Sequence, residues 1–141
     1  MIVLDTNVVS EATQAHPSPA VRAWLRQHPP KDLYITTITK AEMLAGLRIM
    51  AQGRRRETLT AQIGNLLEEE FADRILPFDS PAAKEFASIA RVIKGKPVME
   101  PDRQIAAIAL AHGAAVATRN IKHFTGCGLK LINPWTSEET T

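Results

Sequence analysis

The chain has few of the residues that build disulfide or zinc frameworks. It contains one cysteine, Cys127 in the stretch TGCGL, so it can form neither an internal disulfide nor a thiolate zinc cluster. Its four histidines, at positions 16, 28, 112 and 123, are scattered without the spacing of a zinc site. We therefore expect Cys127 to be a turn residue between two glycines, and we expect no zinc chemistry.

Long hydrophobic runs and a strong excess of charge are also missing. No run approaches the ~20 apolar residues that span a bilayer, and the opening MIVL is too short for a signal peptide and lacks its basic flank. The simplest expectation is a cytoplasmic protein that does not enter a membrane. A net charge of +2 permits nucleic-acid binding but falls short of a dedicated basic binder.

What is present is the composition of an ordinary globular protein. The chain has 141 residues, of which 45% are hydrophobic and 23% are charged, so a single compact domain is expected and disorder is not. We assign residues 1–136 to this domain and expect residues 137–141, which end in SEETT, to be a frayed tail.

Hydrophobic periodicity alternates between short strands and longer helices. This alternation predicts an α/β fold, with a mainly parallel sheet of about five strands covered by helices on both faces. Serines before prolines at 18 and 80 are expected to cap helices, and His112 followed by Gly113 is expected to end one. The expected strands are 2–4, 33–36, 75–77, 114–117 and 129–132, and the expected helices are 7–13, 18–28, 40–52, 55–72, 80–94 and 102–112.

Three acidic residues fall where ligands usually bind in such a sheet. Asp5 ends the first strand in VLDTN, Glu42 lies in the first turn of a helix in TTITKAEML, and Asp102 opens another helix in MEPDRQIAAIA. Strand carboxyl ends and the starts of the following helices share one edge of a parallel sheet. We therefore expect the three carboxylates to converge if their strands are neighbours.

Each acid also has a purely structural explanation. Thr39 and Glu42 fit a capping box, Asp102 would favour a helix dipole, and Asp5 could cap the next helix. A cluster of all three would be repulsive, however, and stability alone would not select it. A divalent cation would remove the repulsion, and oxygen ligands of this kind suit Mg²⁺.

Six segments of the chain resemble PIN-domain ribonucleases of the VapC toxin type, close to the FitB-like branch. They are MIVLDTNVVSE, TTITKAEMLAGL, RILPFDSPAA, DRQIAAIALAHG, VATRNIKHF and LINPW, and they cover nearly the whole chain in the order found in the family. The resemblance implies a PIN-like three-layer α/β/α sandwich whose acidic pocket binds Mg²⁺ or Mn²⁺ and hydrolyses RNA phosphodiester bonds.

The resemblance also assigns roles to individual residues. Asp5, Glu42 and Asp102 match three acidic positions of the family, with Asp5 and Asp102 as metal ligands, and the fourth acidic position falls on Asn120. Because an amide supplies no charge, the site has one anionic ligand fewer than relatives with aspartate there. The remaining expectations are support of the Asp5 carboxylate by Thr6, Asn7 and Thr118, and a phosphate contact by Arg119. The run Arg54, Arg55 and Arg56 is expected to be a solvated surface at a helix junction.

Partners follow from the resemblance as well. A VapC-type toxin is held inactive by a small VapB-like or FitA-like antitoxin that also binds operator DNA, and it forms a homodimer. Two alternatives stay open: a catalytically silent PIN-like docking module, which Asn120 favours, and a phosphohydrolase of the haloacid-dehalogenase type. The latter needs a D-x-D pattern, whereas Asn7 occupies the position of the second aspartate.

Overall fold

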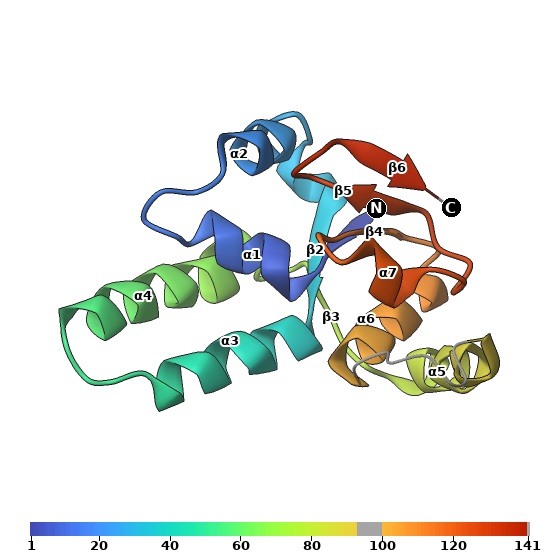
Figure 1. Cartoon of the computed structure of the whole chain (residues 1–141). Helices are drawn as coiled ribbons and strands as arrows, with labels where there is room; N and C mark the ends of the chain where they lie inside the picture. Colours follow the sequence, from blue (N-terminus) through green and yellow to red (C-terminus); the bar gives the residue numbers. More distant parts are fainter. Residues whose placement is uncertain (93–99, 141) are drawn as a thin grey trace.

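The computed structural model describes residues 1–92 and 100–140, which form one mostly parallel sheet flanked by helices (Figure 1). Within this part of the chain the sheet has six strands in the order β3-β2-β1-β4-β5-β6, and the pairing of β5 with β6 is antiparallel. The strands are β1 Ile2–Leu4, β2 Leu33–Thr36, β3 Ile75–Leu76, β4 Ala115–Ala117, β5 Leu131–Asn133 and β6 Glu138–Thr140. The predicted α/β class is confirmed.

Helices connect these strands and agree in most places with the predicted ranges. None of the described helices is long and apolar enough to cross a membrane. The end of the helix expected over 80–94 lies outside the described residues at 93 and 94. The helices are α1 Thr6–Ala12, α2 Pro19–Arg26, α3 Thr37–Ile49, α4 Arg54–Asn65, α5 Ser80–Val92, α6 Glu100–Ala111 and α7 Ile121–Phe124, with a short 3-10 turn at Pro30–Asp32 and a π-helical turn at Leu66–Glu70.

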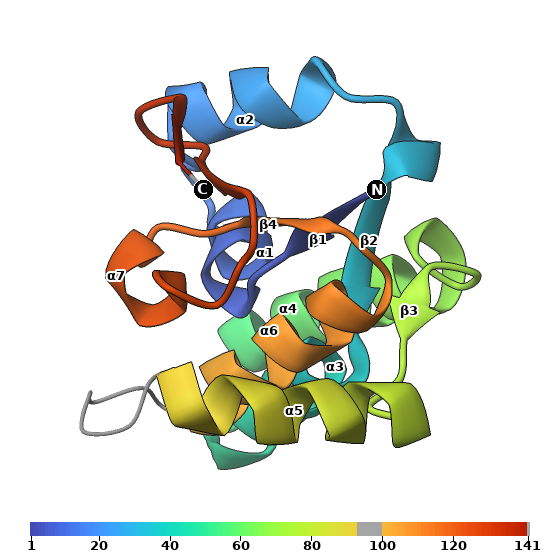
Figure 2. The ribbon, with the colours of Figure 1, turned by 90° about the vertical axis from the view of Figure 1, so that its right-hand side faces the viewer.

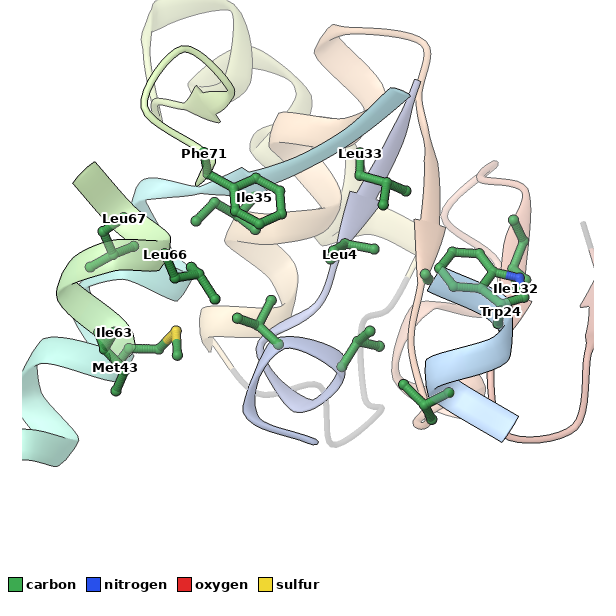
Figure 3. Packing of buried hydrophobic residues seen from close by; sticks show 14 of the residues in the cluster. Leu4, Trp24, Leu33, Ile35, Met43, Ile63, Leu66, Leu67, Phe71 and Ile132 are labelled. Atoms are coloured by element: carbon green, nitrogen blue, oxygen red, sulfur yellow. The ribbon is translucent and has the colours of Figure 1, made fainter. Parts of the chain in front are cut away.

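Side chains of the sheet alternate between two hydrophobic clusters because successive residues of a strand point to opposite faces. In β1, Val3 packs against α5 and α6, whereas Leu4 packs on the other face with residues of α1, α2, α3 and α4. Figure 2 shows α2 and α5 on opposite sides of the strands, and Figure 3 shows the cluster that contains Leu4, Trp24 and Phe71. The two clusters make the predicted layered sandwich.

Three expectations about helix ends are corrected by the structure. Helix α3 begins at Thr37 and not after Thr39, because the Thr36 hydroxyl is the cap and accepts from the Thr39 amide at 3.2 Å. Helix α5 is capped by Asp79, whose carboxylate accepts from the Ala82 amide at 3.1 Å, whereas the prediction placed the cap on Ser80. Glu42 therefore lies a full turn inside α3, where it is not part of a capping box.

The expectation of a frayed tail from 137 is also corrected. Residues Glu138–Thr140 pair antiparallel with β5, and Lys130 forms an ion pair with Glu139 at 3.2 Å. A tight turn makes this pairing possible, since Ser137 has a φ of 60° and its amide donates to the Asn133 carbonyl at 2.7 Å. The segment extends the sheet by one edge strand.

Candidate active site

The three predicted acids lie at the mouth of one polar pocket of about 390 Å³. Asp5 follows β1, Glu42 projects from α3, and Asp102 lies in the first turn of α6. The other residues of the pocket wall come from α1 and the segment after it, from α6, and from the segments after β4 and β5. They include Thr6, Asn7, Ser10, Glu11, Gln14, Arg119, Asn120, His123 and Trp135.

Asp5 is the most buried acid of this pocket, with 3% of its surface exposed. It caps α1, and its Oδ1 accepts from the Thr6 amide at 2.7 Å. Its Oδ2 accepts from the hydroxyl of Thr118, itself fully buried, at 2.7 Å. The carboxylate is thereby held by the first residue of α1 and by a residue that follows β4. The Asp5 amide joins the same two segments, because it donates to the Ala117 carbonyl at 2.9 Å.

Burial raises the pKa of Asp5 to about 6 from its ordinary value of 3.8. The hydrogen bonds from Thr118 and Thr6 oppose this change, whereas the negative charges of Asp102 and Glu42 add to it. The two other acids are therefore close enough to repel Asp5 electrostatically. A cation in the pocket would lower the pKa of Asp5 again.

Glu42 is joined to the site through two threonine hydroxyls. The Thr6 hydroxyl donates to Glu42 Oε1 at 2.7 Å and lies 2.9 Å from the Thr39 hydroxyl. Because the single proton of Thr6 goes to Glu42, Thr39 is the donor in the second bond. One oxygen of the exposed Glu42 carboxylate is thus fixed, and its other oxygen has no hydrogen-bond partner among the described residues.

Asn7 and Thr118 organise the segment that follows β4. The Thr118 hydroxyl accepts from the Asn120 amide at 3.0 Å, and the side chain of Asn7 donates to the same hydroxyl at 3.5 Å. Asn7 also accepts from the Arg119 amide at 3.3 Å. These bonds use the backbone of Asn120, so that its side chain lines the pocket.

Arg119 borders the pocket beside an aromatic ring. Its guanidinium carbon lies 5.0 Å from the centre of the Trp135 ring, within the range of a cation–π contact. Both residues line the pocket, and Arg119 is exposed. The geometry leaves the guanidinium accessible to an anion that enters the pocket.

His123 is a pocket residue that the sequence analysis did not single out. Its Nδ1 lies 2.7 Å from Asp102 Oδ2, and about a third of its side chain is exposed. The contact depends on the short helix α7, which begins after Asn120 and was not predicted. The signal available in the sequence was the spacing of three residues between Asn120 and His123, which places both on one side of a helical turn.

The donor set at this pocket fits a hard divalent cation that keeps several water ligands. Its oxygen donors are the carboxylates of Asp5, Asp102 and Glu42 and the amide of Asn120. Within residues 1–92 and 100–140, no three His, Cys, Asp or Glu side chains lie close enough together to hold a metal ion by themselves, so water and substrate oxygens would have to complete its coordination. Mg²⁺ is commonly held by one or two carboxylates plus water and substrate phosphate, so an open set of this kind suits it and does not suit zinc.

Comparisons with known proteins agree with this architecture. A family model described as the PIN domain matches residues 2–125. The chain is 42% identical over 137 residues to VapC ribonuclease Y4jK of Sinorhizobium fredii, which covers 96% of this chain and 98% of that protein. It is 38% identical over 137 residues to Toxin FitB of Neisseria gonorrhoeae, with coverage of 96% and 99%.

A solved structure gives the same result. The structure of FitAB bound to an IR36 DNA fragment contains a chain that is 39% identical, with a TM-score of 0.89 and coverage of 96% of both chains. The resemblance drawn from the six sequence segments is thereby confirmed over nearly the whole chain.

Proposed function

Since the chain belongs to the PIN-domain family, among toxins of the VapC and FitB type, we propose that it is a metal-dependent endoribonuclease and the toxin of a toxin–antitoxin pair. The observation that carries the proposal is the pocket in which Asp5, Glu42 and Asp102 lie together. A relative named as a ribonuclease, 42% identical over most of both chains, supports the same activity. The alternative of a phosphohydrolase of the haloacid-dehalogenase type is excluded, because the chain belongs to the PIN-domain family.

The residues that would hold Mg²⁺ or Mn²⁺ are Asp5 and Asp102, with Glu42 contributing directly or through water. When bound, a divalent ion supplies a water of lowered pKa and neutralises charge on the scissile phosphate. Thr118 and Thr6 keep the Asp5 carboxylate oriented, which avoids a cost of reorganisation when substrate arrives.

Three further side chains complete the proposed chemistry. The Glu42 oxygen that does not bond Thr6 accepts a proton from the attacking water, or orients that water. The amide of Asn120 positions a second water in the pocket. Arg119, supported by the Trp135 ring, binds a phosphate oxygen of the RNA.

The experiment compares cleavage of total cellular RNA by the wild type, Asp5→Asn and Asp102→Asn, with Mg²⁺ and with EDTA. Asp73→Asn is the matched control, because Asp73 is exposed and lies outside the pocket. We expect cleavage by the wild type and the control in Mg²⁺, and loss of cleavage in EDTA and in both pocket variants. Activity that survives both pocket substitutions would show that the RNA is cut elsewhere.

The proposed partner is an antitoxin of the VapB or FitA type, through which operator DNA is bound. A structure titled as FitAB bound to DNA, with a chain 39% identical to this one, supports this partner. Homodimerisation and action in the cytoplasm, where the proposed substrate is found, belong to the same proposal. Expression of the chain alone should arrest growth, and co-expression of the antitoxin should restore it. Growth that is indifferent to the toxin gene would contradict the assignment.

The docking-module alternative keeps one specific observation in its favour. Asn120 lines the pocket at a place where a carboxylate would strengthen metal binding. A silent module predicts that millimolar Mg²⁺ or Mn²⁺ leaves the melting temperature of the wild type unchanged, whereas the nuclease predicts a rise.

A further inference from the structure

Helix α4 presents two chemically different faces to solvent. Arg55, Thr58, Leu59 and Gln62 follow one another at helical spacing and line a groove of about 410 Å³ against the end of α1. Arg56 lies on another face, which borders a separate hollow with Glu57 and Thr60. We call the first of these the α1–α4 groove, and its remaining wall consists of Thr13, Gln14 and Ala15.

The α1–α4 groove differs from the acidic pocket in charge. Among the described residues that line it, Arg55 is the one charged side chain, and the others are threonines, glutamines, a leucine and an alanine. The acidic pocket is bordered by the carboxylates of Asp5, Glu11, Glu42 and Asp102 and by the single guanidinium of Arg119, so that carboxylates outnumber arginines there. A polyanion is repelled by those carboxylates wherever no cation intervenes, whereas the groove offers it a guanidinium and neutral hydrogen-bond donors.

The groove and the acidic pocket share one lining residue just beyond the end of α1. Gln14, which follows the end of α1, lines both of them, while Asp5 caps the beginning of that helix. The helix between them, Thr6–Ala12, is about 10 Å long at a rise of about 1.5 Å per residue. The wall of the groove opposite α4 is formed by residues 13–15, which follow α1.

The position of Arg55 is not explained by the stability of α4. It lies in the first turn of the helix, where a positive charge is unfavourable, and Gly53 provides no capping side chain. Within residues 1–92 and 100–140, its guanidinium forms no ion pair or hydrogen bond. The groove therefore contains a cation whose partner is not another part of this chain as described.

We propose that the α1–α4 groove binds the backbone of single-stranded RNA beyond the cleaved bond, with Arg55 contacting a phosphate. This proposal rests on the proposed ribonuclease function and adds a binding surface to it. Gln14 and Gln62 donate to phosphate or ribose oxygens, and Leu59 contacts the face of a base. Arg55 is exposed, as was expected for the run Arg54, Arg55 and Arg56, and the proposal adds a substrate-binding role to it.

The test measures binding of a fluorescently labelled, uridine-only RNA strand by fluorescence anisotropy, in EDTA so that no cleavage occurs. Arg55→Gln is compared with Arg56→Gln, which removes the same charge from the adjacent residue but from another face of α4. Arg55→Lys retains the charge at the groove. Thermal unfolding of each variant is recorded by circular dichroism, so that a loss of binding is not confused with a loss of structure.

We expect Arg55→Gln to weaken binding about tenfold, because one charge-assisted hydrogen bond is lost. It should also reduce the slope of log affinity against log salt by about 0.7, the value for one phosphate contact to a single strand. Arg56→Gln should match the wild type in both measurements, and Arg55→Lys should retain most of the binding.

Equal losses in Arg55→Gln and Arg56→Gln would overturn the proposal, since they would reflect net charge and not the groove. Unchanged RNA binding in Arg55→Gln together with weakened antitoxin binding would also overturn it and assign the groove to a protein partner. Because binding is measured without metal, the test of the RNA-binding groove does not depend on the test of the nuclease activity. A protein that binds RNA through Arg55 but cuts none refutes the nuclease and retains the groove.

Discussion

Replacing Asp5 by asparagine should stabilise the protein when no divalent cation is present. The Asp5 carboxylate is 3% exposed and shares its pocket with two other acids, so that ionisation is costly in the folded state. Asparagine carries no charge and can accept the Thr6 amide in the same way, but its NH2 group cannot accept the bond that the Thr118 hydroxyl donates to Oδ2. The loss of that bond, about 1 kcal/mol, is smaller than the electrostatic penalty worked out below. The substitution therefore removes an electrostatic penalty, which in the wild type a bound metal ion would offset.

The size of this penalty follows from the pKa of Asp5. Its pKa rises from 3.8 to about 6, and each pH unit of difference corresponds to about 1.36 kcal/mol, which makes a penalty of about 3 kcal/mol. Because the folded-state pKa is the higher one, the folded state binds more protons between these two values. Stability of the wild type should fall as pH rises from 3.8 to about 6, and the full penalty should be present above that range.

The assay is urea unfolding in EDTA across this pH window for the wild type, Asp5→Asn and the control Asp73→Asn. The advantage of Asp5→Asn over the wild type should grow by about 3 kcal/mol between roughly pH 4 and pH 7. Asp73→Asn should follow the wild type, since Asp73 is exposed. A difference between Asp5→Asn and the wild type that stays constant with pH would refute the reasoning.

Three further predictions concern the metal, a pocket histidine and a helix cap. Mn²⁺ should raise the melting temperature of the wild type with increasing concentration and raise that of Asp102→Asn less; equal shifts in scanning calorimetry would argue against Asp102 as a ligand. His123→Ala should weaken Mn²⁺ binding about tenfold by titration calorimetry, because Asp102 loses its orienting contact, whereas His123→Asn should restore part of it; three equal affinities would contradict this. Thr36→Val, which keeps the shape of a buried side chain but removes the cap of α3, should lower the free energy of unfolding by about 1 kcal/mol in urea; an unchanged midpoint would show that the cap contributes nothing.

Sequence patterns predicted the strand and helix order well because burial dominates it. Val3 and Leu4 are both hydrophobic and point to opposite faces of the sheet. A central strand that is covered by helices on both faces must have this pattern. The edge location of Asp5, Glu42 and Asp102 followed from the same topology. What the acids do chemically stays a prediction.

The choice of capping residue was harder to predict where two similar residues lie close together. Thr36 and Thr39 both have a hydroxyl at capping spacing, and the choice between them depends on where β2 ends. Pairing of Thr36 with Leu76 extends β2 to Thr36, so that residue becomes the cap and Thr39 turns inward to meet Thr6. A single sequence does not reveal such a pairing.

Contacts between distant segments were the other source of error. Residues Glu138–Thr140 are polar and look like a disordered end, yet the strand β5 supplies hydrogen-bonding partners along one edge. His123 looked isolated because its neighbour Asp102 lies 21 positions earlier in the chain. Both features depend on tertiary structure and have no signature in local periodicity.

The location of β1 between β2 and β4 has a consequence for protein synthesis. Asp5 leaves the ribosome early, but the hydroxyl that orients it belongs to a residue 113 positions later, and the central pairing with β4 must wait for the same stretch. A nascent chain that stalls before that stretch is complete lacks the assembled centre. The proposed activity therefore depends on residues that are synthesised late in the chain.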